Sequence, residues 1–250
     1  MSETGAVTAA VLVIGDEILS GRTKDKNVGY IAEYMTRIGI ELREARVVSD
    51  VQAEIVAALN ALRARYDYVF TTGGIGPTHD DITADAVAAA FGVSIDEDPR
   101  AIAMMSERYA PGDFTPARRR MARIPFGADL VANSVSKAPG FRIGNVIVMA
   151  GVPSIMQLML DEAAKDLRTG VKMSSRTVEA GGVPEGRYGT QLAEIAGAHG
   201  QVVIGSYPSF ADGKFRNQIV VRGKDEGSIA AACDAVEAML QVLREEMKPI

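Results

Sequence analysis

The sequence has few of the residues that build disulfides and metal sites rich in cysteine or histidine. Its 250 residues include one cysteine, two histidines and no tryptophan. The lone Cys233 cannot form an internal disulfide or a cysteine-based metal site, and two histidines are too few for a histidine-based one. The start of the chain shows no signal peptide, so this cysteine usage favours a reducing cytoplasm.

Long apolar runs and an excess of positive charge are also missing. The first apolar run, Val7 to Ile14, is much shorter than the roughly 20 residues that span a membrane, so we expect no membrane partner. Lys and Arg number 27 against 32 Asp and Glu, a net charge of −5. This balance argues against a general nucleic-acid binder, which usually carries a basic stripe. An apolar fraction of 47% is that of an ordinary soluble globular protein, but glycine occurs 25 times.

Apolar and amphipathic segments alternate along roughly the first 150 residues, which is the pattern of strands and helices in turn. The predicted strands are residues 7–14, 41–48, 68–72 and 146–149. The predicted helices are residues 27–38, 52–65, 82–91, 99–109, 115–123 and 154–167. This order predicts an α/β fold, with a parallel sheet and helices on both faces.

A polar stretch over residues 168–175 indicates a linker, and a smaller unit follows it. Its pattern predicts strand, helix, two strands and a final helix, which is a small α+β domain. Cys233 falls on the apolar stripe of the last helix, so we expect a buried structural thiol. The chain is therefore divided into domains over residues 1–169 and 170–250.

The strongest local motif is the run TTGGIGPTHDDIT, residues 71–83. Gly73, Gly74 and Gly76 lie between a predicted strand and a predicted helix, where glycine lets the main chain approach a ligand closely. A helix N-terminus that follows presents free N–H groups to an anion. The run lacks the Gly-Lys-Ser/Thr of a Walker A loop and the third glycine of a Rossmann fingerprint. We therefore expect it to bind a phosphate or another anion.

Acidic residues beside this loop predict a cation. Asp80 and Asp81 would repel a bare phosphate, whereas a divalent cation such as Mg²⁺ takes oxygen ligands from carboxylate and phosphate together. Asp16 follows the first strand and is predicted at the same carboxyl edge, so it would converge with Asp81, and Asp50 and Asp80 are further candidates. The alternatives are structural: a turn at Asp16, and helix capping by Asp50 or Ser49 and by Asp80 or Asp81.

A basic cluster of Arg118, Arg119, Arg120 and Arg123 lies on a predicted helix. It is either a solvated face or a surface that attracts an anionic ligand. No Gly-x-Ser-x-Gly elbow is present and histidine is scarce, so a nucleophilic triad is not indicated.

Together, the motifs resemble the molybdopterin-binding domain of the CinA family. The resemblance spans roughly residues 8–167 and rests on motifs in the same order: residues 15–27, 73–83, 133–141 and 151–156. The region is more distantly similar to MoaB, MogA, the related domain of MoeA and the domain fused to eukaryotic FAD synthase. The resemblance implies a three-layer α/β/α sandwich with a mostly parallel sheet, followed by a small KH-type domain. Long family members add a nicotinamide-nucleotide amidase domain, which we expect this chain to lack.

Family members include enzymes that cleave the pyrophosphate of ADP-ribose or FAD with a divalent metal, and often K⁺. Others bind molybdopterin or adenylylate it. The resemblance implies that Asp16 and Asp81 are catalytic and hold the metal, which would be Mg²⁺, Mn²⁺ or Co²⁺. The residues implied for binding phosphate and a nucleotide or pterin are Gly73, Gly74, Gly76, Thr78, Asn133, Pro139, Gly140, Gly151 and Ser154.

From this resemblance we expect a cytoplasmic, metal-dependent nucleotide pyrophosphohydrolase that releases AMP and forms a homo-oligomer, either a dimer or a trimer. The alternatives are a non-catalytic module that binds molybdopterin or a nucleotide, and an enzyme that adenylylates molybdopterin.

Overall fold

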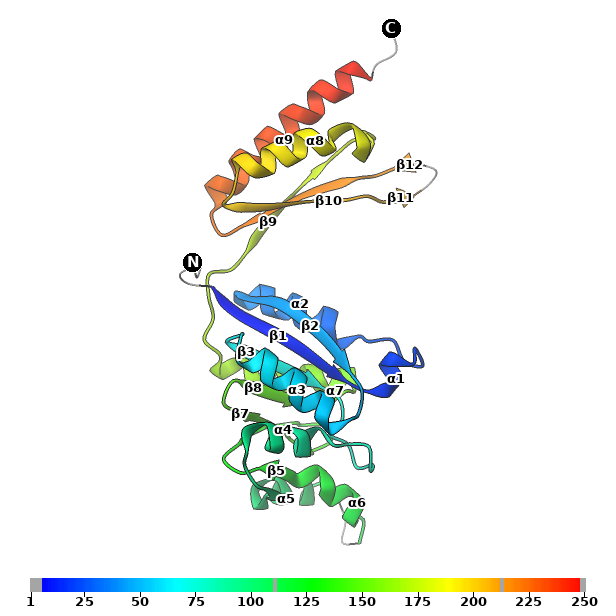
Figure 1. Cartoon of the computed structure of the whole chain (residues 1–250), viewed down its shortest axis with the longest axis vertical. Helices are drawn as coiled ribbons and strands as arrows, with labels where there is room; N and C mark the ends of the chain where they lie inside the picture. The colour runs from blue at the N-terminus through cyan, green and yellow to red at the C-terminus, as the bar shows by residue number, and fades with distance from the viewer. Residues whose placement is uncertain (1–5, 110–111, 212–213, 248–250) are drawn as a thin grey trace. The chain divides into compact units, whose positions relative to one another are not determined.

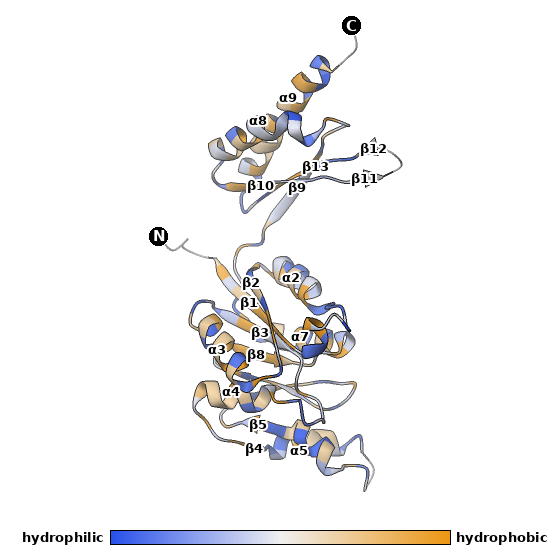
Figure 2. Cartoon of the chain, turned by 45° about the vertical axis from the view of Figure 1, so that its right-hand side comes forward, coloured by the Kyte–Doolittle hydropathy of each residue, from blue (hydrophilic) through white to orange (hydrophobic). Residues whose placement is uncertain are grey.

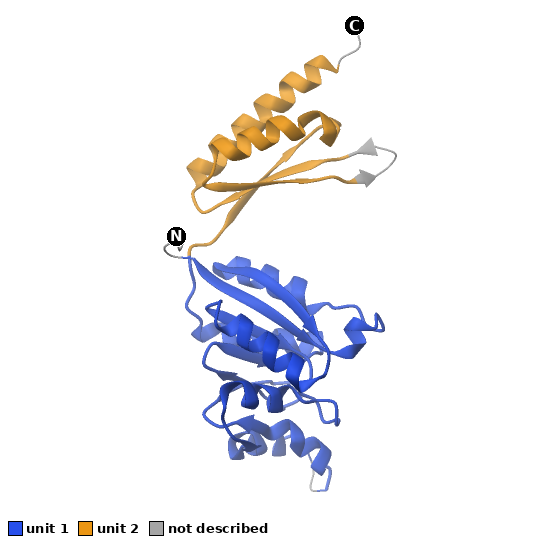
Figure 3. Cartoon of the chain, viewed as in Figure 1, with its two compact units in different colours: residues 1–170 blue, residues 171–250 orange. Residues whose placement is uncertain are grey.

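The chain forms two compact units, Met1–Gly170 and Val171–Ile250 (Figure 3). The computed structural model describes residues 6–109, 112–211 and 214–247. The first unit has two hydrophobic core clusters, and the second unit has one.

A six-stranded sheet in the order β2-β1-β3-β8-β7-β6 lies at the centre of the first unit (Figure 1). The strands are β1 (Val7–Ile14), β2 (Ile40–Val48), β3 (Tyr68–Thr72), β6 (Asp129–Val131), β7 (Gly140–Ile143) and β8 (Val146–Met149). The first four in the sheet order are parallel; β7 pairs antiparallel with β8, and β6 pairs antiparallel with β7. The predicted mostly parallel sheet is confirmed.

The central strands are buried because their side chains are apolar on both faces. Every residue of β1 except Thr8 is buried, and β3 and β8 are buried throughout. Figure 2 shows the apolar colouring along β1 and β8. Parallel strands covered by helices on both sides need continuous apolar runs of this kind.

Helices cover both faces of the sheet, which gives the predicted three layers (Figure 1). The helices are α2 (Asn27–Ile38), α3 (Gln52–Arg63), α4 (Thr83–Phe91), α5 (Pro99–Ser106) and α7 (Pro153–Ala163). On one face α3 and α4 pack through residues such as Leu59 and Val87. On the other, α2 and α7 pack through Ile31 and Met156. The short helix α1 (Asp16–Leu19) follows β1, and the 3-10 turn η2 (Ala164–Asp166) follows α7.

The predicted helix over residues 115–123 is wrong in its second half. It consists of α6 (Pro116–Arg119) and the 3-10 turn η1 (Arg120–Ala122), and Arg123 already begins a strand. That strand, β5 (Arg123–Pro125), pairs with β4 (Ile95–Glu97). Pairing with a distant segment therefore overrides the local helical pattern.

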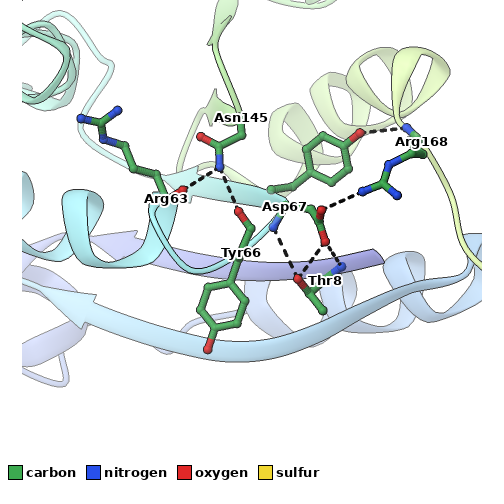
Figure 4. Close-up of polar contacts among 7 residues, drawn as sticks. Thr8, Arg63, Tyr66, Asp67, Asn145 and Arg168 are labelled. Atoms are coloured by element: carbon green, nitrogen blue, oxygen red, sulfur yellow. Dashed lines mark hydrogen bonds and ion pairs between the residues drawn. The ribbon is translucent and has the colours of Figure 1, made fainter. Parts of the chain in front are cut away.

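A polar network ties together the amino ends of the sheet strands (Figure 4). The carboxylate of Asp67 accepts hydrogen bonds from N and Oγ1 of Thr8 at 2.8 and 3.0 Å, and pairs with Arg168 at 2.7 Å. Burial raises the pKa of Asp67, but the bonds from Thr8 and the charge of Arg168 outweigh it, so the pKa lies below its usual range. Nδ2 of Asn145 donates to two main-chain carbonyls of the turn before β3, each at 2.9 Å.

The second unit is a three-stranded antiparallel sheet in the order β10-β13-β9, packed with two helices. Its elements are β9 (Ser174–Glu179), α8 (Glu185–Ala198), β10 (Val202–Tyr207), β11 (Phe210–Ala211), β12 (Lys214–Phe215), β13 (Gln218–Gly223) and α9 (Glu226–Glu246). The α+β class is confirmed, whereas the KH-type assignment stays a prediction. Cys233 is buried on α9, and burial raises the pKa of its thiol. In the described ranges, no helix has both the length and the apolar character needed to cross a membrane.

Candidate functional site

The loop between β3 and α4, residues 73–82, is called the glycine loop. It lies so close to its neighbours that two of its positions exclude any side chain. Gly73 has φ +103°, and a Cβ there would lie 2.1 Å from the main-chain oxygen of Ile14, the last residue of β1. Gly74 has φ +67°, and its Cβ would lie 2.2 Å from Oγ1 of Thr83. Both positions therefore require glycine, because of the left-handed backbone and because of the close approach.

Thr83, the first residue of α4, holds this loop in place. Its Oγ1 donates to the carbonyl of Gly73 at 2.9 Å, and its N–H donates to the carbonyl of Gly74 at 3.0 Å. The side chain is fully buried. Thr83 is the last residue of the motif over residues 71–83, but its role is not predictable from the sequence, because a threonine at the start of a helix has no pattern that reveals a partner in the preceding loop.

Asp81 closes the loop and does not cap the following helix. The N-cap position of α4 is Ile82, and no side chain forms a capping hydrogen bond there, so the capping alternative for Asp80 and Asp81 is wrong. Instead, Oδ2 of Asp81 accepts hydrogen bonds from N and Oγ1 of Thr78 at 2.8 and 2.6 Å. A Cβ on Gly76 would lie 2.6 Å from the same oxygen. Thr78 and Gly76 thus shape the loop around the Asp81 carboxylate.

Asp50 likewise does not cap a helix. The N-cap of α3 is Val51, without a side-chain hydrogen bond, so the expected cap by Asp50 or Ser49 is wrong. Oδ2 of Asp50 instead accepts a 2.8 Å hydrogen bond from the main-chain N–H of Asp16, the first residue of α1. Because β1 and β2 are parallel neighbours, the residues that follow them meet at the carboxyl edge of the sheet (Figure 1).

Several negative charges gather beside the glycine loop. Burial raises the pKa of Asp50, and the nearby charges of Asp16, Glu17 and Asp80 raise it further, against the opposing hydrogen bond from the Asp16 N–H. The structure therefore brings the negative charges of Asp16, Glu17 and Asp80 within range of Asp50, while Oδ2 of Asp81 is engaged by Thr78. This cluster of Asp16, Asp50 and Asp80 is called the acidic edge below.

The acidic edge fits a cation that takes part of its ligands from a substrate. Within the described part of the chain, no three His, Cys, Asp or Glu side chains are close enough to form a metal site by themselves. Mg²⁺ is usually held by one or two carboxylates, with substrate phosphates and water completing its octahedron. Asp16 and Asp50, which a hydrogen bond already joins, would be the two protein ligands.

A small pocket borders the same loop, and it is called the loop pocket below. Gly74, Ile75 and Gly76 form one wall. The rest of the wall includes Asp81, Asp85, Arg120, Met121, Arg123, Pro139 and Phe141. The acidic edge does not line this pocket, and neither do Gly151 and Ser154.

Most of the basic cluster beside the loop pocket is engaged within the protein. Arg123 forms two 2.7 Å hydrogen bonds to the carboxylate of Asp85. Arg119 pairs with Glu97, and Arg118 donates to a main-chain carbonyl. These three arginines therefore serve local structure.

Asn133 and Gly140, both predicted to line the ligand pocket, are used in packing. Asn133 is buried, and its Oδ1 accepts hydrogen bonds from the N–H groups of the next loop residues, Val135 and Ser136. Its Nδ2 donates to the carbonyl of Ala138, so the amide shapes the turn that leads to the pocket residue Pro139. A Cβ on Gly140 would lie 2.3 Å from a main-chain oxygen of β8.

Gly151 and Ser154 follow β8 at the same edge of the sheet. A Cβ on Gly151 would lie 3.2 Å from Cα of Gly73, so the two glycine segments touch. The carbonyl of Gly151 accepts a 2.9 Å hydrogen bond from Nδ2 of Asn27, which is buried. Asn27 is the last residue of the family motif over residues 15–27, and the sequence predicted no role for it. Oδ1 of Asn27 is buried and has no partner among the residues that the structure describes. Ser154 is exposed in the first turn of α7.

Comparison with known proteins agrees with this arrangement. Residues 10–169 match the family described as probable molybdopterin binding domain, and residues 172–245 match the middle domain of FAD synthase. A protein of Pyrobaculum arsenaticum is 33% identical over 210 residues, which cover 80% of this chain and 79% of that protein. A CinA-like protein of Syntrophus aciditrophicus is 35% identical over 242 residues, which cover 91% of this chain but only 57% of that longer protein.

Among solved structures, the protein CinA from Thermoplasma acidophilum is similar to the first unit. Its TM-score is 0.61 at 37% identity, and the match covers 64% of this chain and 98% of that one. The family match extends over most of the chain and includes the glycine loop and the acidic edge. The chain therefore belongs to the CinA family of proteins with a molybdopterin-binding domain.

Proposed function

We propose that the first unit is a metal-dependent nucleotide pyrophosphohydrolase that cleaves ADP-ribose or FAD and releases AMP. The observation that carries this proposal is the meeting of two complementary features at one edge of the sheet. The glycine loop borders a pocket through Gly74, Ile75 and Gly76 that would take a phosphate, and Asp16 and Asp50 suit a cation that shares the phosphate oxygens. With a net charge of −5, the chain offers no general attraction to phosphate, so the cation and local N–H groups must supply it.

Each part of the site has a separate role in this proposal. The main chain of Gly74 and Gly76, which line the pocket, would lie against the non-bridging phosphate oxygens, whereas the N–H of Gly73 already donates to the carbonyl of Met149. Asp16 and Asp50 would hold the cation. When bound, a divalent cation neutralises phosphate charge and lowers the pKa of water. In the reaction, a water oxygen bonds to the adenylyl phosphorus and the bond to the bridging oxygen breaks. AMP and a second phosphate monoester leave, and a proton is released.

The second unit supports a dinucleotide as the substrate class. Residues 172–245 match the middle domain of FAD synthase, an enzyme named for a molecule in which a diphosphate joins flavin and adenosine. FAD therefore stands beside ADP-ribose as a substrate to be tested first.

The test is to incubate the full chain with ADP-ribose or FAD and with Mg²⁺, Mn²⁺ or Co²⁺, with and without K⁺, and to quantify AMP. Asp16→Ala and Asp50→Ala should each lower the rate about a hundredfold or more, since a metal ligand acts on the transition state. Glu162→Gln, which removes an exposed carboxylate on α7, is the matched control and should leave the rate unchanged. Absence of AMP with every metal, or full activity in both aspartate variants, would contradict the proposal.

A second candidate is a molybdopterin-binding protein, either a non-catalytic carrier or an enzyme that adenylylates the pterin. The description of the matching family favours it. A carrier would bind molybdopterin saturably in calorimetry without turnover, whereas an adenylylating enzyme would consume ATP and release pyrophosphate only when molybdopterin is present. Neither would release AMP from ADP-ribose.

A further inference from the structure

Arg120 differs from the other arginines of the basic cluster because its guanidinium is poorly satisfied. Its Nε is buried, and no residue in the described ranges accepts a hydrogen bond from it. One Nη atom lies 3.4 Å from the main-chain oxygen of Asp81, which is long for a charged donor. A buried donor without an acceptor is unfavourable, so this position calls for an additional acceptor.

The two carboxylates that line the loop pocket with Arg120 are bonded to other residues in this structure. Of the two carboxylates in the loop pocket, Asp85 is held by both Nη atoms of Arg123. The other, Asp81, accepts two hydrogen bonds from Thr78 on Oδ2, and its hydrogen bond from Arg120 is made by the main-chain oxygen. The guanidinium thus keeps an unbonded Nε donor at the wall of a pocket whose two carboxylates are bonded to Arg123 and Thr78.

The chemistry of the loop pocket suits a phosphate group. Arg120 lines it together with Gly74, Ile75 and Gly76, so an anion there would lie next to the loop on which a phosphate is proposed. Arginine presents a planar fork of N–H groups that matches phosphate oxygens, and it keeps its charge at every physiological pH. The acidic edge, which suits a cation, does not line this pocket.

We propose that the loop pocket binds the second phosphate of a nucleoside diphosphate and that Arg120 selects for that phosphate. This inference rests on the proposed function only in assuming a nucleotide ligand. The site needs no hydrolysis, so binding alone can test it.

The experiment is isothermal titration calorimetry of the full chain in Mg²⁺, with AMP and with α,β-methylene-ADP, whose bridging carbon resists hydrolysis. The wild-type chain should bind the diphosphate analogue more tightly than AMP. Arg120→Gln should weaken the affinity for the analogue about tenfold or more, which is the contribution of a charge-assisted hydrogen bond. It should leave the affinity for AMP within about threefold of the wild-type value. Arg120→Lys keeps the charge but loses the fork, so its affinity for the analogue should lie between those of the wild-type chain and Arg120→Gln.

Arg118→Gln is the matched control, because it removes the same charge from a residue that does not line the loop pocket. It should leave both affinities unchanged. The proposal is wrong if the wild-type chain binds neither probe or binds both equally, if Arg120→Gln keeps the preference, or if Arg118→Gln also loses it. A chain that shows the Arg120-dependent preference but releases no AMP from ADP-ribose or FAD keeps this site and lacks the proposed hydrolytic activity.

Discussion

The main-chain N–H of Asp16 donates a 2.8 Å hydrogen bond to Oδ2 of Asp50, although the two residues are 34 positions apart. The bond joins the segments that follow two adjacent parallel strands, and it places Asp50 within range of the negative charge of Asp16. It favours the charged form of Asp50, but burial and the neighbouring negative charges outweigh it and raise the pKa. A site that collects like charges in this way is suited to a cation.

Replacing Asp50 should stabilise the protein at neutral pH. Because its folded-state pKa is raised, ionisation penalises the folded state above that pKa, and the penalty is absent below the unfolded pKa of about 3.9. Asp50→Asn removes the charge and keeps an oxygen that accepts from Asp16. Thermal unfolding should show a midpoint higher by roughly 2 °C near neutral pH, and no difference below about pH 4. A lower midpoint near neutral pH would show that the charged form helps to hold α1.

Replacing Asp67, in the network of Figure 4, should have the opposite effect. Its pKa is lowered, so its contribution to stability is present above the unfolded pKa and is lost as the pH falls through the folded pKa. Asp67→Asn should therefore cost about 1–2 kcal/mol of unfolding free energy near neutral pH, and less in acid. Both aspartates belong to the first unit, so each variant is a control for the other in the same pH series. Shifts of the same sign would contradict the two pKa directions.

Adding a methyl group at Gly73 should distort the loop. Gly73→Ala places a Cβ 2.1 Å from a main-chain oxygen, and main chain cannot move aside as a flexible side chain can. Gly127→Ala is the matched control, because Gly127 also has a positive φ but nothing within 4 Å of its Cβ. The control should cost about 1 kcal/mol, and Gly73→Ala at least about 2 kcal/mol more, with loss of nucleotide binding. Equal losses in denaturant unfolding would contradict the close approach.

Two substitutions of Asp81 separate its role in loop geometry from a role in metal binding. Asp81→Asn keeps an oxygen that accepts from Thr78, whereas Asp81→Ala removes both hydrogen bonds. If Asp81 acts by shaping the loop, affinity for AMP in calorimetry should stay within about tenfold for the asparagine variant and fall further for the alanine variant. Equal and large losses in both, with a weakened response to Mg²⁺, would instead support the metal role that the family resemblance implies.

Local patterns in the sequence predicted much of the first unit. Continuous apolar runs such as β1 and β8 and the amphipathic α3 show their periodicity within a few residues, so their type follows from local physics. The strands β6 and β7 were missed because segments of 3 and 4 residues are too short to show alternation. β5 was missed because its pairing with β4 overrides a helical pattern.

In the candidate site, too, the local sequence predicts some features and not others. The glycines after β3 and the acidic residues after neighbouring strands can be identified from the sequence, because glycine and strand-end residues carry a local signature. The hydrogen-bond partner of each side chain cannot be identified from the sequence. Asp50 looks like a helix cap but accepts from Asp16, and Asp81 looks like a helix cap but accepts from Thr78. These partners depend on distances between segments that the chain order does not specify.

By itself, the sequence determined the longer strands and helices of the first unit, that the sheet is mostly parallel, and which residues follow its strands at the carboxyl edge. Only the tertiary structure decided which groups meet there, with the Asp16 N–H bonded to Asp50 in the acidic edge and Nε of Arg120 left without an acceptor among the described residues at the loop pocket. The physical reason is that hydrogen bonding and burial act over a few ångströms between residues far apart in the chain. In the basic cluster, four similar arginines therefore have different roles according to the acceptors that the fold places beside them.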